Sequence, residues 1–200
     1  MTSLTIKDMT VYFIEGNIGA GKSTLIERLK QTLETTNTKV NIKFLTEPID
    51  TWTNYYGVNM LNEFYQNKNT NAFKFQWLAF MSVYKQIMES YGNYDILICE
   101  RSPHTVRHIF IEMLREDGCL DEIEYKLLTD FIDTVLEHTN FPEHKFIFLD
   151  ESTQTCLERI QQRGRIEEKD INIDYLKNLK KWHDKYLLDK SNVTVINLSS

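Results

Sequence analysis

The sequence predicts a three-layer α/β fold in which helices cover both faces of a five-stranded parallel sheet. Short apolar runs that suit buried strands alternate along the chain with longer segments of helical periodicity. A glycine-rich loop also stands between the first of these runs and the first helical segment. The 200 residues, of which 42% are hydrophobic, can bury one full core, so we expect a single domain over residues 1–200.

Five short runs, each bounded by polar residues, predict the strands. They are continuously apolar or rich in β-branched and aromatic residues, which is typical of strands that are buried on both faces of a sheet. We expect strands at residues 11–14, 40–45, 95–99, 145–149 and 193–198.

Apolar residues at helical spacing predict the helices between these strands. We expect helices at residues 24–33, 72–91, 103–115, 122–137, 153–163 and 174–188. On the last of these, the residues that indicate packing against the core are Tyr175, Leu176, Leu179, Trp182 and Tyr186. The polar residues 66–71 predict a loop. An alternation of strands and helices implies right-handed crossovers, a parallel sheet, and ligands at the carboxyl ends of the strands.

The charge and the cysteines restrict the class of protein. A formal net charge of −6 argues against binding of a nucleic acid polymer, which normally requires a basic face. Cys99, Cys119 and Cys156 are odd in number and form no CxxC pair, which favours free thiols in a reducing compartment. The sequence shows neither a basic start followed by an apolar leader nor an apolar run near the ~20 residues that span a bilayer. We therefore expect a cytoplasmic protein without a membrane partner.

The glycine-rich loop matches GxxxxGK[ST], the pattern of a phosphate-binding loop, or P-loop. Glycines let successive backbone N–H groups point at phosphate oxygens, and the following helix adds its positive end. Lys22 is expected to reach the β and γ oxygens of ATP, and Ser23 to bind Mg²⁺. The residues expected to bind phosphate are Gly16, Asn17, Ile18, Gly19, Ala20, Gly21, Lys22, Ser23 and Thr24.

Other signatures separate the classes of phosphate-binding protein. Neither DxxG nor NKxD, which are typical of GTPase switches, occurs in the chain, and the HRD and DFG motifs of protein kinases are also missing. Gly19 and Gly21 spell GxG, but Thr24 breaks the dinucleotide-binding pattern. A P-loop nucleotide-binding switch or scaffold remains the non-enzyme alternative.

Several further motifs, taken together with the P-loop, resemble the deoxynucleoside kinase family. They follow the family's order over nearly the whole chain, and they are Thr46-Glu47-Pro48, Trp52, Tyr65, Phe75-Gln76, Glu100-Arg101-Ser102 and the segment from Arg159 to Glu168. The resemblance implies transfer of the γ-phosphate of ATP to the 5′-hydroxyl of a deoxynucleoside, in nucleotide salvage for DNA synthesis. It also implies a homodimer formed through a helix bundle, for which residues 103–115 and 122–137 are the candidates. The family continues beyond its last strand into a loop that borders the donor adenine, whereas this chain ends two residues after Leu198.

Charged residues at the ends of two expected strands are the catalytic candidates. Glu47 follows the second strand, where a carboxylate can take the proton from the attacking hydroxyl. Glu100 and Arg101 follow the third strand. A carboxylate there can hold Mg²⁺ through water, and the planar fork of an arginine can bind a carboxylate and a reacting oxygen at once. Without the resemblance, a surface acid and a structural ion pair are the plainer interpretations.

Three arginines lie at and beyond the end of an expected helix, where Gly164 permits a turn. Arg159, Arg163 and Arg165 predict a lid over about residues 159–168 that brings cations around the transferring phosphoryl group. A solvated basic helix end is the alternative. By resemblance, Arg163 and Arg165 are the closer phosphate contacts.

The acceptor pocket is expected around Gln76, because a single amide in an apolar slot can read the edge of either pyrimidine. By resemblance, Tyr65 and Glu168 hold the sugar 3′-hydroxyl, and Arg101 also contacts the acceptor. The remaining pocket residues that the resemblance implies are Trp52, Leu61, Phe64, Phe75, Ala79, Val83, Val106 and Phe110.

Two valines decide the expected base preference. Relatives that favour deoxycytidine or purines carry an Arg and an Asp at the positions that match Val83 and Val106. Valines offer no partner to an exocyclic amine but suit the methyl group of thymine, so we expect thymidine first and deoxycytidine second. Ala79 favours the opposite, because it leaves room for a purine. Thymidylate kinase is the alternative enzyme, although Glu47 would repel its acceptor phosphate.

Overall fold

The computed structural model describes residues 9–36, 39–139, 141 and 143–198. Its five strands form one parallel sheet in the order β2-β3-β1-β4-β5, which confirms the predicted fold class. The strands are β1 (Thr10–Gly16), β2 (Ile42–Leu45), β3 (Ile96–Glu100), β4 (His144–Asp150) and β5 (Val193–Asn197). All five predicted strands are therefore present among the described residues. The second one starts later than predicted, because the backbone N–H of Asn41 donates to the Asp95 carboxylate (2.7 Å).

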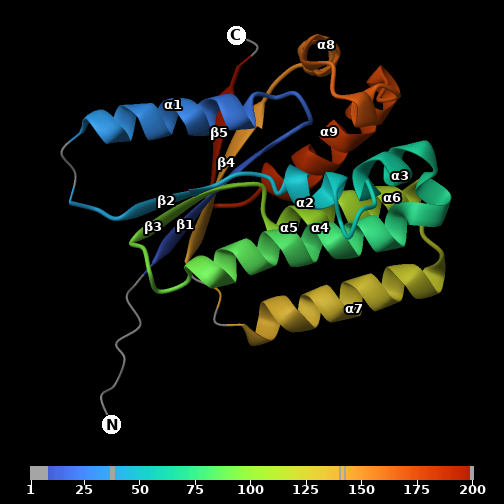
Figure 1. Cartoon of the computed structure of the whole chain (residues 1–200), viewed down its shortest axis with the longest axis horizontal. Helices are drawn as coiled ribbons and strands as arrows, with labels where there is room; N and C mark the ends of the chain where they lie inside the picture. Colours follow the sequence, from blue (N-terminus) through green and yellow to red (C-terminus); the bar gives the residue numbers. More distant parts are fainter. Residues whose placement is uncertain (1–8, 37–38, 140, 142, 199–200) are drawn as a thin grey trace.

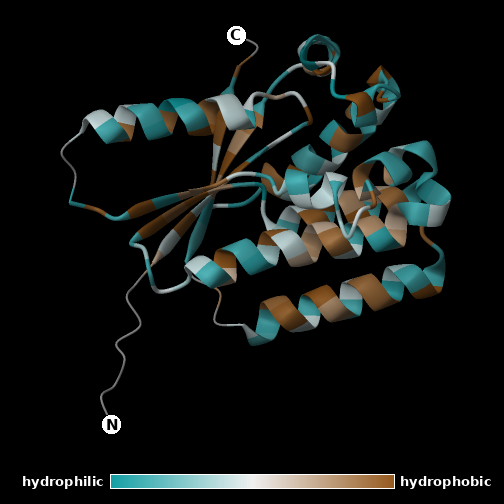
Figure 2. Ribbon diagram, in the orientation of Figure 1, coloured by the Kyte–Doolittle hydropathy of each residue, from teal (hydrophilic) through white to brown (hydrophobic). Residues whose placement is uncertain are grey.

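Strand β1 lies at the centre of the sheet between β3 and β4, and most of its residues are buried. Phe13 and Ile14 have no exposed surface, and Phe13 packs against Phe146 of β4 with ring centroids 5.6 Å apart. Figure 2 shows the same arrangement in its colours, with apolar strands at the centre and polar outer faces on the helices. A parallel strand of this kind is fixed on both faces, so the loop that leaves it starts from a rigid position.

Helices cover both faces of the sheet. Figure 1 shows α1 on one face and α4 on the other, with α7 packed outside α4. The helical segments are α1 (Lys22–Thr35), α2 (Ile49–Thr53), α3 (Met60–Gln66), α4 (Lys68–Ser90), α5 (Pro103–Thr105), η1 (Val106–Phe110), α6 (Ile111–Glu116), α7 (Glu122–His138), α8 (Thr153–Arg163), η2 (Ile166–Glu168) and α9 (Ile173–Leu187). None of the described helices has the length and apolar character needed to cross a membrane.

The predicted loop at residues 66–71 is wrong, because helix α4 already begins at Lys68. The asparagines that suggested a loop are capping residues instead. The Asn67 side chain accepts a hydrogen bond from the backbone N–H of Thr70 (3.3 Å), and Asn71 donates to the Glu63 carbonyl oxygen (2.9 Å). Only Asn67 therefore separates the end of α3 from the start of α4.

The predicted helix at residues 103–115 is present but is not a regular α-helix. Its middle turn, η1, is a π-helix in which the backbone N–H of Ile111 donates to the carbonyl oxygen of Val106. The Arg107 guanidinium holds this turn with two hydrogen bonds to Asp133 of α7 (2.8 Å each) and one to Glu112 (2.6 Å). π-turns often occur at functional sites, and this one carries two predicted pocket residues, Val106 and Phe110.

Candidate active site

The P-loop joins β1 to α1 at the carboxyl edge of the sheet. Gly19 has a φ of 82°, and a Cβ added there would lie 2.4 Å from the carbonyl oxygen of Cys156 in α8. A side chain at this position would therefore clash with backbone that cannot move aside. The close approach brings α8, which carries the predicted lid arginines, against the loop.

Lys22 and Ser23 are the first two residues of helix α1. The Lys22 ammonium donates to the carbonyl oxygens of Asn17 (2.9 Å) and Gly16 (3.3 Å). Burial, together with the nearby Arg101 charge, lowers the pKa of Lys22 to about 8. The Ser23 hydroxyl donates to the Glu100 carboxylate (2.8 Å). Hydroxyl and carboxylate oxygens are the ligands that Mg²⁺ prefers, so this pair fits the ion.

Arg101 and Glu47 form a buried ion pair between the ends of β3 and β2. The Arg101 Nε–H donates to a Glu47 carboxylate oxygen, and a second nitrogen of the guanidinium lies 3.5 Å from the Gly16 carbonyl oxygen. The guanidinium also lies 4.8 Å from the ring centre of Phe110. Burial by itself raises the pKa of Glu47, but the charges of Arg101 and Lys22 reverse this effect and hold it below its ordinary value. Glu47 is therefore ionised and can accept a proton.

The backbone of Arg101 is left-handed, with a φ of 67°. This conformation is rare for a residue with a side chain and is found mainly where function requires it. The backbone N–H of Arg101 donates to the carbonyl oxygen of Ile14 in β1 (3.1 Å), which extends the pairing of the strands by one residue. The chain then turns, and the guanidinium points at Glu47 and the P-loop.

The three predicted lid arginines meet the P-loop in one groove of about 410 Å³. Arg159 is anchored to Glu151 (3.0 Å) and to the P-loop carbonyl oxygens of Gly19 (3.4 Å) and Ala20 (3.3 Å). Arg163 and Arg165 instead both bind the carboxylate of Glu168, the second at 2.7 Å. In this arrangement, the charges of the two arginines predicted to bind phosphate are therefore balanced by the carboxylate predicted to bind the sugar.

A smaller cavity of about 60 Å³ lies between the predicted lid arginines and the pair of Glu47 and Arg101. Nine residues line it, and all of them are predicted site residues: Ile18, Gly19, Lys22, Glu47, Arg101, Phe110, Arg163, Arg165 and Glu168. The P-loop, the ion pair and the predicted lid arginines therefore surround a common space.

Of the predicted acceptor residues, Arg101, Phe110 and Glu168 line this cavity, and three aromatic ones pack against one another. The rings of Phe64 and Phe75 stack 4.7 Å apart, and Trp52 meets Phe75 edge-on at 5.5 Å. Gln76 is only 2% exposed and lies on α4. Four further apolar residues of the predicted acceptor pocket are also buried, and we call them, with the three aromatic residues, the apolar wall: Leu61, Ala79, Val83 and Val106. The pKa of the Tyr65 phenol is raised, mainly by burial and then by the nearby Tyr175. The Glu168 carboxylate is close enough to add to this effect.

Three buried carboxylates at the site were missed by the sequence analysis. Glu15 has no exposed surface and accepts a hydrogen bond from the Thr105 hydroxyl, while burial raises its pKa. Glu151 anchors Arg159, and Glu167 accepts from the Asn59 side chain (2.8 Å). No local pattern marks Glu15 and Glu167, because their partners lie 90 and 108 residues away along the chain. Glu151 precedes its partner Arg159 by eight positions, which is not the spacing of neighbours on a helix.

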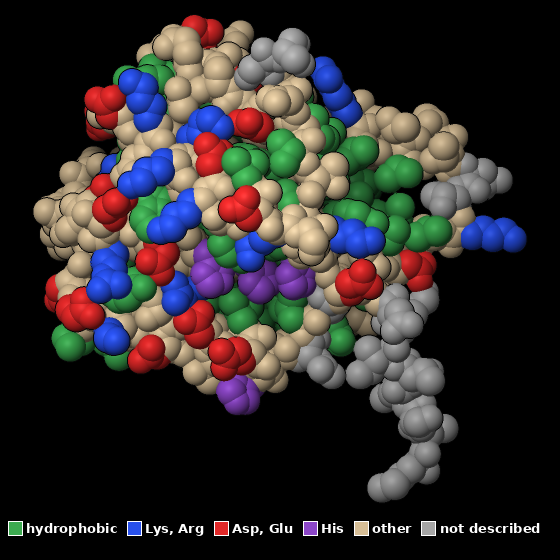
Figure 3. All heavy atoms as spheres, turned by 180° about the vertical axis from the view of Figure 1, so that it is seen from behind, with side chains coloured by type: hydrophobic (Ala, Val, Ile, Leu, Met, Phe, Trp, Pro, Cys, Tyr) green, Lys and Arg blue, Asp and Glu red, His purple; other side chains and the backbone are tan. Residues whose placement is uncertain are grey.

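Two histidines four positions apart, His104 and His108, stack on different aromatic partners. The His104 ring stacks on His144 (4.7 Å), whereas the His108 ring stacks on Tyr186 (4.6 Å). Figure 3 shows histidine side chains gathered on the face opposite to that of Figure 1. Within the described part of the chain, no cluster of three or more histidine, cysteine or acidic side chains could hold a metal ion.

The sequence is similar to known nucleoside kinases. The family model described as deoxynucleoside kinase matches residues 12–200. The chain is 28% identical to thymidine kinase 2, mitochondrial, of Homo sapiens over 182 residues, which cover 91% of this chain and 66% of that protein. It is 31% identical to deoxycytidine kinase of Homo sapiens (89% and 75% covered) and 29% identical to deoxycytidine kinase 2 of Gallus gallus (89% and 74% covered). The chain thus spans somewhat less than two thirds of the length of the thymidine kinase.

The lowered pKa of Lys22 predicts how nucleotide affinity depends on pH. Lys22 is charged below a pH of about 8 and neutral above it, so binding of a non-hydrolysable ATP analogue should weaken as the pH rises through this value. We expect a loss of about tenfold or more, since a hydrogen bond from a charged group contributes about 1.5–3 kcal/mol. Titration calorimetry between pH 7 and pH 9.5 measures it. Lys22→Met should bind weakly at every pH, and an equal pH dependence in this variant would contradict the assignment.

Proposed function

The chain belongs to the deoxynucleoside kinase family, and on this premise we propose that it transfers the γ-phosphate of ATP to the 5′-hydroxyl of a deoxynucleoside in nucleotide salvage. The observation that carries the proposal is the common space between the P-loop, the Glu47–Arg101 pair and the lid. An ATP-binding loop faces a carboxylate across a space that is enclosed by cations. This arrangement suits phosphoryl transfer to a hydroxyl, in which positioning and charge stabilisation provide most of the catalysis.

Glu47 acts as the general base in this proposal. Its carboxylate is ionised and takes the proton of the 5′-hydroxyl as the new P–O bond forms. Arg101 holds the carboxylate in place and supplies a positive charge beside the reacting oxygens. Ser23 and Glu100 would hold Mg²⁺, which neutralises charge on the phosphates when it is bound.

The lid supplies the remaining cations. Arg163 and Arg165 are both engaged by Glu168, the residue that we assign to the sugar 3′-hydroxyl together with Tyr65. A sugar hydroxyl that donates to Glu168 competes with these arginines for the carboxylate oxygens. Acceptor binding therefore releases arginine donors toward the transferring phosphoryl group, which couples sugar recognition to the lid.

The apolar wall supports a preference for thymidine, followed by deoxycytidine. Val83 and Val106 are both buried, at 3% and 2% exposure, and neither offers a hydrogen bond to an exocyclic amine. Gln76 supplies the amide that pairs with either pyrimidine edge.

The three cysteines of the chain are free thiols, which supports a reducing compartment. A cytoplasmic location stays a prediction.

We propose that the chain forms a homodimer, in which helices α7 and α4 bind a second copy of the chain. Ile123 and Leu127 of α7 are 67% and 56% exposed, and Trp77 of α4 stacks on Phe131 of α7 at 4.5 Å. A groove of about 560 Å³ follows the outer side of α4 and contains none of the predicted site residues. An exposed apolar surface of this extent is typical of an interface between subunits. Residues 103–115 gain no support, since the apolar residues of α6 are already fully buried in the single chain.

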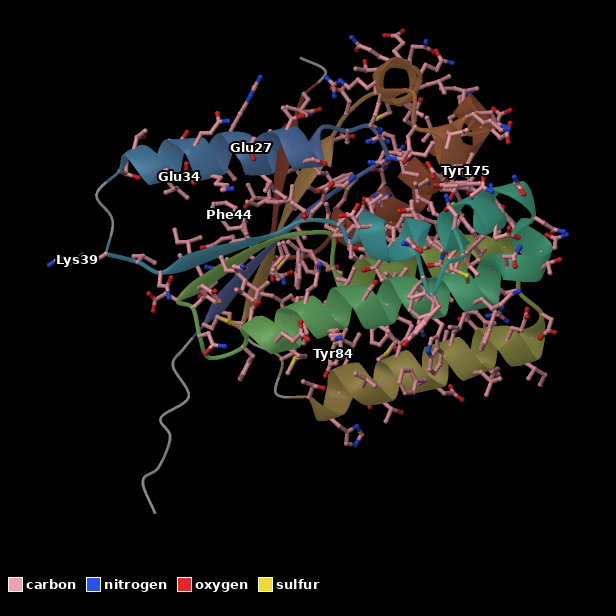
Figure 4. The ribbon with its side chains drawn as sticks, viewed as in Figure 1. Glu27, Glu34, Lys39, Phe44, Tyr84 and Tyr175 are labelled. Atoms are coloured by element: carbon pink, nitrogen blue, oxygen red, sulfur yellow. The ribbon has the colours of Figure 1, made fainter. Side chains whose placement is uncertain are left out.

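The first prediction of this proposal concerns Glu47→Gln. The amide keeps the shape but cannot accept a proton, so turnover should fall by about 10²–10⁴-fold while nucleoside binding remains. The assay measures ADP formed from ATP with thymidine, deoxycytidine, deoxyadenosine, deoxyguanosine or thymidylate. Glu34→Gln is the matched control, because Figure 4 shows Glu34 on α1, away from the pocket.

Each outcome of this assay is decisive. ADP that forms equally without an acceptor would favour a nucleotide-binding switch, and ADP that forms only with thymidylate would favour a thymidylate kinase. A fall of less than threefold in Glu47→Gln, with chemistry limiting the rate, would remove Glu47 from the role of base.

The second prediction concerns the base. Val83→Arg combined with Val106→Asp should move preference away from thymidine toward deoxycytidine or purines, because the new charged pair can bind an exocyclic amine. Competition assays with equal mixtures of deoxynucleosides measure the ratio of products, and we expect a change of about tenfold or more. Preference for a purine in the unmodified enzyme would contradict the role of both valines.

The third prediction concerns the dimer. Leu127→Arg places a charge at the centre of the exposed surface of α7, so it should shift the sedimentation of the protein from the mass of two chains to that of one. Leu188→Arg is the control, since this residue is similarly exposed (49%) but follows α9. A single-chain mass for the unmodified protein at micromolar concentration would overturn the proposal.

A further inference from the structure

The hydroxyl of Tyr175 is buried without a hydrogen-bond partner among the described residues. Tyr175 lies in the first turn of α9, where the Asn172 side chain accepts from its backbone N–H (2.9 Å). Figure 4 shows its side chain beside α3, the helix that carries Tyr65. A buried hydroxyl that lacks a partner is destabilising, and packing of the ring does not require the hydroxyl. The packing role predicted from sequence therefore explains the ring and leaves the hydroxyl unexplained.

The Tyr175 ring is held in a defined position. The Lys68 ammonium, at the start of α4, lies 3.8 Å from its ring centre, and the Tyr65 ring meets it nearly perpendicularly at 6.4 Å. The two phenols are close enough for each to affect the pKa of the other, although no hydrogen bond of good geometry joins them. The unpartnered hydroxyl is thus next to the residue that we assign to the sugar 3′-hydroxyl.

The protons at the sugar end of the pocket can be assigned by elimination. The Glu168 carboxylate oxygens act as acceptors toward Arg163 and Arg165, so the 3′-hydroxyl is the donor when it binds them. Tyr65 must then donate its own proton to the 3′-oxygen, which leaves the Tyr65 oxygen as an acceptor. Burial raises the pKa of both phenols, so Tyr175 also keeps its proton and is the neighbouring group able to donate it.

On the basis of the proposed function, we propose that Tyr175 is a positioning residue for recognition of the acceptor's 3′-hydroxyl. Its hydroxyl donates to the Tyr65 oxygen when an acceptor is bound, and this orients the Tyr65 proton toward the 3′-oxygen. The chain of hydrogen bonds then runs in one direction, from Tyr175 through Tyr65 and the 3′-hydroxyl to Glu168. Lys68 fixes the Tyr175 ring from its face. An acceptor that lacks the 3′-hydroxyl cannot complete this chain, because both bonds to the sugar are missing.

Tyr175→Phe tests the proposal, because it removes only the hydroxyl. The dissociation constant of thymidine, measured by calorimetry, should rise about three- to tenfold, the range of one neutral hydrogen bond. Binding of 3′-deoxythymidine should not change, and the thermal midpoint should be equal to or above that of the unmodified protein. Tyr84→Phe is the matched control: its hydroxyl bonds the Thr139 hydroxyl (2.8 Å), so the variant should lose stability and keep thymidine affinity.

A double substitution separates positioning from a direct contact. In the Tyr65→Phe background, Tyr175→Phe should have no further effect on thymidine binding, because Tyr175 acts through Tyr65. An unchanged affinity of Tyr175→Phe for thymidine, or an equal loss for 3′-deoxythymidine, would overturn the inference. If the unmodified protein binds and phosphorylates no deoxynucleoside, the proposed function fails first and the inference fails with it.

Discussion

The buried pair of Arg101 and Glu47 is the interaction on which the rest of the site depends. It joins the end of β3 to the end of β2, and the same guanidinium lies over Phe110 and near the P-loop carbonyl oxygen of Gly16. Breaking such a pair would leave an uncompensated buried charge, which typically costs about 3–5 kcal/mol. The left-handed backbone at Arg101 is therefore maintained by contacts that also place the Glu47 carboxylate, which we propose as the general base.

The wider site balances charge that could not otherwise be buried. Lys22 and Arg101 are enclosed together with Glu15, Glu47 and Glu100, and each acid is held by a different donor. Burial raises the pKa of Glu15, whereas the nearby cations keep Glu47 ionised. In an environment of low dielectric constant, this division fixes which carboxylate is available as a base and which is structural. The lid repeats the principle, because Glu168 neutralises Arg163 and Arg165.

Sequence predicted the parts of the site that depend on local pattern. Strand runs and the GxxxxGK[ST] loop gave the sheet and the P-loop, because both are encoded in consecutive residues. The short helices α2 and α3 were missed, since five or seven residues are too few to show periodicity. The contact between Asn59 and Glu167 joins positions 108 residues apart, so no sequence window contains both. The sequence also could not predict that the Tyr175 hydroxyl lacks a hydrogen-bond partner among the described residues, because this depends on which side chains surround it in the fold.

The central claim, that Arg101 holds Glu47 ionised inside the pocket, can be measured directly. A carbon-detected NMR titration of labelled glutamate carboxyls follows Glu47, and its signal is identified by its loss in Glu47→Gln. The account predicts a pKa below the ordinary glutamate value of about 4.3 in the unmodified protein. It also predicts that the pKa of Glu47 rises clearly in Arg101→Leu, because burial raises this pKa and the opposing charge of Arg101 is then missing. A Glu47 pKa that is ordinary in the unmodified protein and unchanged in Arg101→Leu would contradict the account.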